Sequence, residues 1–280
     1  MKKLWQRYCE RKTSVVGLVL LVLITVVALI APWIAPHQPW DIVGTPFLPP
    51  FEDSAHLLGT DTLGRDIFSG IVHGTRISLT IGLVCMIATV ILGLALGAVA
   101  GYYGKWIDDV LMRSTEFFQV LPNFVFVVVL VAIFRPSIGS IFLAIVIVSW
   151  PPVARLVRSE FLSLRSREFV EAAVAVGHTN RWIIFKEILP NALSPIVAMS
   201  SLMVASSILL ESAVSFLGLG DPNLMTWGYM IGTGRTVIRG AWWMSVLPGV
   251  ALVSTILIIN VVGEGLGRAW NPRLSNGAAR

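Results

Sequence analysis

The chain has 280 residues and a formal net charge of +5; 55% of its residues are hydrophobic and 13% are charged. A water-soluble domain of this length needs far more charge, so the composition indicates a membrane protein. The two cysteines, Cys9 and Cys85, and the four histidines show no metal-ligand spacing, and we predict no metal and no cofactor. The positive charge follows the predicted membrane topology, which argues against nucleic acid as a partner.

Six stretches without Asp, Glu, Lys or Arg are long enough to cross a bilayer core of about 30 Å. A tight hairpin at Pro136 and Gly139 is expected between the third and the fourth. We therefore predict an all-α membrane protein with six transmembrane helices. The predicted spans are 13–40, 77–104, 117–134, 136–154, 188–210 and 240–263.

Most Lys and Arg residues fall on one side of these spans, in segments 1–12, 105–116, 155–187 and 264–280. Basic segments favour the cytoplasmic side, so both termini are predicted to be cytoplasmic. The apolar run 14–34 is longer than the core of a signal peptide, and we interpret it as an uncleaved anchor. The basic residues predicted outside are Arg65, Arg76, Arg135, Arg235 and Arg239.

The segment between the fourth and fifth spans has a helical pattern on the aqueous side. Phe169, Ala172, Ala173 and Val176 share one helical face, and the alanines leave that face shallow enough for another surface to approach closely. Gly177 can adopt the left-handed conformation that ends a helix.

A second short helix is expected to follow this turn. Thr179 or Asn180 can cap its start, and Pro190 is expected to limit it. The segment is thus predicted to be a compact helix-turn-helix on an aqueous face.

The spacing of Glu171-Ala172-Ala173, Gly177 and Leu189-Pro190 resembles the EAA loop of bacterial ABC importer permeases. The resemblance implies that this loop docks into a cleft on a separate ATPase subunit and transmits its motion. Glu187 departs from the family pattern, and an interfacial amphipathic helix without a partner is the alternative. The residues assigned to the coupling loop by this resemblance are Arg165, Glu168, Glu171, Ala172, Ala173, Gly177, Glu187, Leu189 and Pro190.

The predicted outer loop 35–75 begins with a proline-rich coil, 36–50, and continues with His56-Leu57-Leu58-Gly59-Thr60-Asp61 and Gly64-Arg65-Asp66. This block resembles the second, shorter permease type of the dipeptide, oligopeptide and nickel branch. It is either a structural loop or a surface that receives a substrate-binding protein. The run 211–220 also resembles this branch.

With this resemblance, the chain divides into three parts. Residues 1–76 hold the basic N-terminal segment, the first transmembrane helix and the outer loop. Residues 77–270 form a five-helix permease core with the coupling loop at 160–190, and residues 271–280 form a cytoplasmic tail. The segments 263–268 and 271–273 match the family's C-terminal pattern in part.

Two features of the spans concern helix packing and bending. Gly93, Gly97 and Gly101 form a small-residue ladder that favours close helix packing, with a hinge as the alternative. Pro151-Pro152 should bend the fourth span, either as a static kink or as a gating bend.

Other side chains are expected at the membrane boundaries. Arg155 and Arg158 are predicted to reach the inner headgroups, and Trp227, Trp242 and Trp243 to form an interfacial belt.

Glu211 is the most embedded acidic residue, expected near the outer interface with partial burial. It has either a pathway or gate role or a helix–helix hydrogen bond.

The resemblance implies the permease half of an ATP-driven importer in the bacterial inner membrane. Its expected partners are a second homologous permease subunit, one or two cytoplasmic ABC ATPases, a periplasmic or extracellular substrate-binding protein and membrane lipid. The chain has no Walker motif, so it is not predicted to be an enzyme. Peptides are the predicted cargo, with nickel, metal chelates or opines as alternatives.

Two other classes of protein fit the sequence less well than the importer. An ion-coupled secondary transporter would need ionisable groups near the middle of a span, and the predicted spans have none there. An intramembrane enzyme would need a nucleophile with a base, or metal ligands, and the sequence contains no such set.

Overall fold

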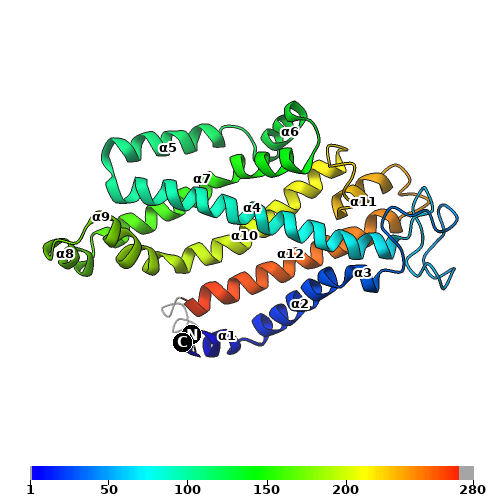
Figure 1. The fold of residues 1–280 in the computed structure, drawn as a ribbon, viewed down its shortest axis with the longest axis horizontal. Coiled ribbons are helices and arrows are strands. Elements are labelled where there is room, and N and C mark those ends of the chain that lie inside the picture. The colour runs from blue at the N-terminus through cyan, green and yellow to red at the C-terminus, as the bar shows by residue number, and fades with distance from the viewer. Residues whose placement is uncertain (1, 271–280) are drawn as a thin grey trace.

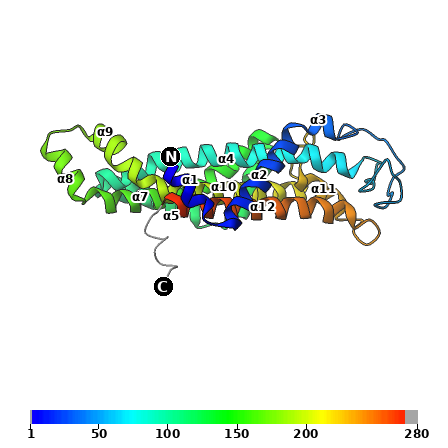
Figure 2. The ribbon, with the colours of Figure 1, turned by 90° about the horizontal axis from the view of Figure 1, so that it is seen from below.

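The computed structural model describes residues 2–270, and this part of the chain is built from helices. The long helices run nearly parallel along the longest axis of the molecule (Figure 1). Helices α8 (Glu168–Ala175) and α9 (Asn180–Trp182) lie at one end, which we call the inner end. The non-helical segment 35–66 lies at the other, outer end, as Figure 2 also shows. The remaining helices are α1 (Lys2–Cys9), α2 (Lys12–Leu29), α3 (Ala31–Ile34), α4 (Ile67–Tyr103), α5 (Lys105–Gln119), α6 (Asn123–Phe134), α7 (Ile138–Arg165), the π-helix η1 (Ile183–Ile188), α10 (Leu189–Phe216), α11 (Trp227–Gly234) and α12 (Trp243–Trp270).

Five helical segments are long and apolar enough to cross a membrane: α2, α4, α7, Asn180–Phe216 and α12. A sixth crossing requires α5 and α6 to be counted together, and these two helices meet at 82°. The predicted third span, 117–134, is therefore interrupted, because its first residues belong to α5 and its last residues to α6. The break falls at Pro122, because the residue before a proline is disfavoured in the helical conformation.

Helix boundaries at the outer end differ from the predicted ones. Helix α4 begins at Ile67, well before the expected residue 77, because the Asp66 carboxylate caps it by accepting hydrogen bonds from the Ser69 N–H (2.8 Å) and hydroxyl (2.6 Å). The predicted outer loop therefore ends at Asp66. The first span is shorter than predicted, because α2 ends at Leu29 and a separate short helix, α3, starts at Ala31 with Pro32 in its first turn.

The small-residue ladder on α4 packs against α7. A Cβ added to Gly93 would lie 2.6 Å from the Val153 Cβ, and one added to Gly97 would lie 2.4 Å from the Ala154 carbonyl oxygen. The two backbones are thus as close as they can be, which supports the packing interpretation over a hinge. Helix α7 continues without interruption through Pro151-Pro152.

Helix α5 is fastened to α7 by an ion pair. Two of the three guanidinium nitrogens of Arg158, Nε and Nη2, donate to the carboxylate of Asp108, which is buried on α5. The prediction that Arg158 reaches the lipid headgroups is therefore wrong. Its pairing with Asp108 depends on the packing of α5 against α7, which the sequence alone does not give. Arg155 is exposed.

The beginning and end of the described chain lie side by side. The Tyr8 hydroxyl donates to the Ser14 carbonyl oxygen (2.9 Å), and a Cβ on Gly265 of α12 would lie 2.8 Å from the Tyr8 ring. Burial, with a smaller contribution from Cys9, raises the pKa of Tyr8, so this donor stays protonated. Helix α1 therefore packs on the inner half of α12.

Two of the three tryptophans predicted to form an interfacial belt are buried anchors instead. The Trp227 indole N–H donates to the Ile71 carbonyl oxygen (3.2 Å), and that of Trp243 donates to the Thr60 carbonyl oxygen (3.1 Å). Trp242 is 50% exposed. A buried indole needs a hydrogen-bond acceptor, and here the acceptors join α4 and the outer segment to α11 and α12.

Candidate functional site

The segment 165–190, which we call the EAA segment, turns sharply at Gly177. The Gly177 N–H donates to the Val174 carbonyl oxygen (2.9 Å), and the His178 N–H donates to that of Ala173 (3.1 Å). This is a Schellman motif, and Gly177 has the positive φ of 87° that the motif requires. The predicted role of Gly177 as the residue that ends the first helix is confirmed.

Helix α8 has an inner and an outer face. Val170 and Ala173 are buried in an apolar cluster with residues of α4, α7, η1 and α10. Phe169 is 39% exposed and Val176 is 77% exposed. Ala172 is exposed, but Ala173 is buried. The predicted face of Phe169, Ala172, Ala173 and Val176 is therefore divided between the exposed side and the buried side of α8. The shallow exposed surface of α8 is therefore carried by Ala172 and its apolar neighbours.

The chain after the turn differs from the predicted second helix. The Thr179 hydroxyl caps α9 by accepting from the Trp182 N–H (3.4 Å), as expected. Pro190 does not limit this helix, because α9, η1 and α10 continue as one helix into the membrane span. At the end of the π-helix the Leu189 N–H donates to the Ile184 carbonyl oxygen. Pro190 has no N–H, and the helix continues past it into α10.

The structure places the remaining predicted residues around these helices. Glu168 and Glu171 are exposed in the first turn of α8. Their negative charges interact favourably with the positive N-terminal end of the helix dipole. Glu187 is half-buried, and its carbonyl oxygen accepts from the Asn191 side chain (2.7 Å). The Arg165 guanidinium carbon lies 5.8 Å from the centre of the Tyr102 ring. Tyr102 was not predicted to belong to this site.

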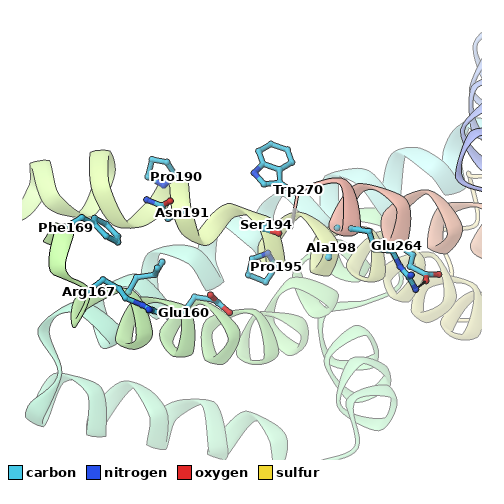
Figure 3. A pocket seen from close by; sticks show the side chains of 13 residues that line it. Glu160, Arg167, Phe169, Pro190, Asn191, Ser194, Pro195, Ala198, Glu264 and Trp270 are labelled. Carbon is cyan, nitrogen blue, oxygen red and sulfur yellow. Dashed lines mark hydrogen bonds and ion pairs between the residues drawn. The ribbon is translucent and has the colours of Figure 1, made fainter. Parts of the chain in front are cut away.

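An open groove of about 1010 Å³ lies beside the EAA segment. Figure 3 shows Phe169 and Arg167 toward one end, Pro195 of α10 and Trp270 of α12 near the middle, and Glu264 of α12 toward the other end. The groove is therefore lined by apolar surface with charges at its edges. No sequence signal pointed to it, because its lining comes from four separate helices, α7, α8, α10 and α12.

Glu211 lies at the opposite end of α10 and is only 1% exposed, so the expectation of partial burial is wrong. Its carboxylate accepts a hydrogen bond from the Ser215 hydroxyl (2.7 Å) and a longer one from the Ser212 hydroxyl (3.3 Å). Both oxygen atoms of the Glu211 carboxylate therefore have a hydrogen-bond donor within α10 itself.

The fold defines a class of protein when it is compared with solved structures. The inward-facing methionine ABC transporter MetNI matches with a TM-score of 0.61 and 19% identity, over 72% of this chain and 96% of that chain. An amino acid ABC transporter with histidines matches with a TM-score of 0.57 and 16% identity, over 72% and 94%. The helices are therefore arranged in the fold of ABC importer permeases.

The family follows from the sequence. Residues 93–276 match the family described as binding-protein-dependent transport system inner membrane component, and residues 1–51 match the N-terminal TM domain of oligopeptide transport permease C. This chain belongs to the binding-protein-dependent transport system inner membrane component family. It is a multi-pass membrane protein, and the predicted resemblance to the peptide branch of ABC importer permeases is confirmed.

Relatives match over nearly the whole chain. The di/tripeptide transport system permease protein DppC of Pseudomonas aeruginosa is 36% identical over 99% of this chain and 94% of its own length. The dipeptide permease DppC of Bacillus subtilis is 36% identical over 96% and 85%. The oligopeptide permease OppC of Haemophilus influenzae is 36% identical over 97% and 89%.

Proposed function

We propose that this chain is one of two permease subunits of an ATP-driven, binding-protein-dependent importer of di- or oligopeptides. The observation that carries the coupling role is the exposed apolar surface of α8. Val174 and Val176 are 57% and 77% exposed at the inner end of the molecule, next to the Gly177 turn. Apolar side chains gathered at one tip favour a protein partner, and a separate ATPase subunit is the partner that this family requires.

The proposed topology counts α5 and α6 as one bent crossing. With α2, α4, α7, α10 and α12 this gives six crossings, which place both termini on the side of the EAA segment. The packing of α1 against the inner half of α12 supports this arrangement. The Lys and Arg bias of the sequence then makes the inner end cytoplasmic.

The cargo is proposed from the relatives, whose names specify dipeptides, tripeptides and oligopeptides. The groove beside α10 would form the inner part of the pathway, completed by a second, homologous permease. Selection of the cargo would rest with an outer binding protein, and ATP hydrolysis with one or two ATPase subunits. Purifying the native complex and identifying the ligand of its binding protein tests the cargo.

The docking role is tested by Gly177→Asp in the complete complex. An added Cβ at Gly177 meets no atom within 4 Å, so the carboxylate would point away from the chain and into the proposed interface. We expect ATP-dependent uptake to be lost while the protein remains in the membrane. Gly177→Asn is the matched control, because asparagine has the same size, tolerates positive φ and adds no charge.

Normal uptake by Gly177→Asp would contradict docking at this surface. Loss of uptake in both variants would instead assign the defect to side-chain size or to the turn. Uptake that continues without ATP and stops with an uncoupler would replace the importer with an ion-coupled transporter.

A further inference from the structure

Tyr102 lies where three helix ends meet at the inner end of the molecule. It is near the end of α4, and its hydroxyl donates to the Oδ1 atom of Asn180, the first residue of α9, at 2.9 Å. Its ring faces the Arg165 guanidinium at the end of α7. This hydrogen bond connects residues 78 positions apart in the sequence and ties the EAA segment to a helix that does not flank it.

The neighbouring parts of α4 and α7 form one unit. A Cβ on Gly97 would lie 2.4 Å from the Ala154 carbonyl oxygen, and one on Gly101 would lie 2.6 Å from the Phe161 Cβ. Such close backbone contact packs the two helices tightly together. A displacement of the EAA segment can reach this unit along the chain through α7 and also across the contacts at the end of α4.

Those contacts are of two kinds. Val170, Ala173 and Ile183 pack against Tyr102 and Phe161 in an apolar cluster. Apolar contact is non-directional and permits small shifts. The bond between the Tyr102 hydroxyl and Asn180 is directional and fixes one position of α9 on α4.

Helix α4 reaches from this point to the outer end. Its 37 residues extend about 55 Å at 1.5 Å per residue, far beyond a bilayer core of about 30 Å. At its outer half, the Ile71 carbonyl oxygen accepts the Trp227 indole N–H of α11. The helix is thus held at both ends by groups from other elements.

We propose that Tyr102 and Asn180 form a positioning joint through which movement of the EAA segment is passed to α4 and along α4 to the outer end. The inference rests on the proposed coupling role of this segment. It assigns a function to a tyrosine hydroxyl that lies outside the EAA motif. The reverse direction follows by linkage: an event at the outer end reaches the ATPase through the same bond.

The test uses the purified complex of both permeases, the ATPase and the binding protein in proteoliposomes. The measurement is ATP hydrolysis with and without the binding protein. Tyr102→Phe keeps the ring and removes the hydroxyl, and Asn180→Ala removes the acceptor. Loss of one neutral hydrogen bond should lower the ratio of stimulated to basal hydrolysis about twofold to tenfold.

Three further variants make the result specific. Asn180→Asp keeps an oxygen acceptor and should restore near-normal stimulation. The double variant Tyr102→Phe/Asn180→Ala should be no worse than either single variant, because both remove the same bond. Tyr103→Phe is the control, since Tyr103 is 42% exposed next to Tyr102.

Unchanged stimulation in Tyr102→Phe, or additive effects in the double variant, would overturn the joint. Failure of Asn180→Asp to restore stimulation would also contradict it. A failure of the proposed function looks different: the ATPase would be absent from the wild-type complex, or Gly177→Asp would behave as the wild type, and the joint would then have no motion to transmit.

Discussion

The two ends of the molecule contain the same kind of turn in different surroundings. Gly177 ends α8 at the inner end with φ 87°, and Gly218 ends α10 at the outer end with φ 85°. Both are Schellman motifs, since the Leu219 N–H also returns to the Val214 carbonyl oxygen (3.2 Å). An added Cβ would meet nothing within 4 Å at either glycine. Helix-ending chemistry alone therefore does not distinguish the two sites.

The difference lies in what surrounds each turn. Beside Gly218, Arg235 donates to the Phe216 carbonyl oxygen (2.7 Å), and the Asp221 carboxylate accepts from the Ile138 N–H (3.0 Å) at the start of α7. Beside Gly177, Val174 and Val176 are exposed. The outer turn is fastened by the chain itself and exposes Phe216 and Leu217 to 38% and 43%, whereas the valines at the inner turn are more exposed. The exposed valines beside Gly177 support the proposal that the ATPase docks at the inner turn.

The sharpest test of this comparison places the same charge at both turns. Gly218→Asp should share the backbone strain of Gly177→Asp, of about 1 kcal/mol. We expect Gly177→Asp to reduce ATP-dependent uptake at least about tenfold, because an unpaired charge buried in an interface costs about 2–5 kcal/mol. Gly218→Asp should retain most of the uptake. Equal losses in the two variants would show that strain, not docking, decides the result.

A second prediction concerns the ion pair that holds α5 at the inner end. Asp108→Asn leaves the partly buried Arg158 guanidinium without its counter-charge, and we expect a loss of about 2–3 kcal/mol in the free energy of unfolding. Thermal unfolding of the purified protein in detergent measures it. Asp109→Asn, at an exposed neighbour, should have almost no effect. Equal stability of the two variants would show that the pair does not fasten α5.

A third prediction tests whether the outer end is fastened as tightly as its hydrogen bonds indicate. Trp243→Phe removes the indole donor to the buried Thr60 carbonyl oxygen and should cost about 1–2 kcal/mol. Trp242→Phe, at the adjacent and half-exposed tryptophan, should stay within about 0.5 kcal/mol. A larger loss of stability in Trp242→Phe than in Trp243→Phe would support the interfacial belt predicted from the sequence.

The elements that could be predicted were those with a local signal. The long apolar runs, the Gly177 turn and the Thr179 cap each depend on residues close together in the sequence, and the structure confirms them. The bend between α5 and α6 also has a local signal, Pro122. A single span is nevertheless predicted there from the sequence, because residues 117–134 contain no charge.

The parts that could not be predicted depend on contacts between distant segments. Tyr102 reaches Asn180, and Arg158 reaches Asp108, only because α4, α5 and α7 lie side by side. The burial of Trp243 depends on the outer segment folding over α12. A single sequence gives the chemistry of these side chains, but it does not give their partners.

The smallest predicted effect is that of Glu211→Gln, at the buried acid of the outer half. The structure supports a hydrogen-bonding role, because the carboxylate accepts from Ser215 and Ser212 inside the subunit. Glu211→Gln keeps an acceptor oxygen, so we expect uptake within about twofold of the wild type and a stability change below about 1 kcal/mol. Glu211→Ala removes both acceptors and should cost about 1–3 kcal/mol, because the buried hydroxyls lose their partner.

These two variants separate the two roles that the sequence left open for Glu211. A hydrogen-bonding role requires stability to fall in Glu211→Ala and uptake to survive in Glu211→Gln. A pathway or gate role requires the negative charge itself, so uptake would collapse in Glu211→Gln while the thermal unfolding of the protein stayed unchanged. Loss of uptake in Glu211→Gln would also weaken the contrast between a fastened outer end and an inner end that couples to a partner. The buried carboxylate of Glu211 would then give the outer end a part in transport.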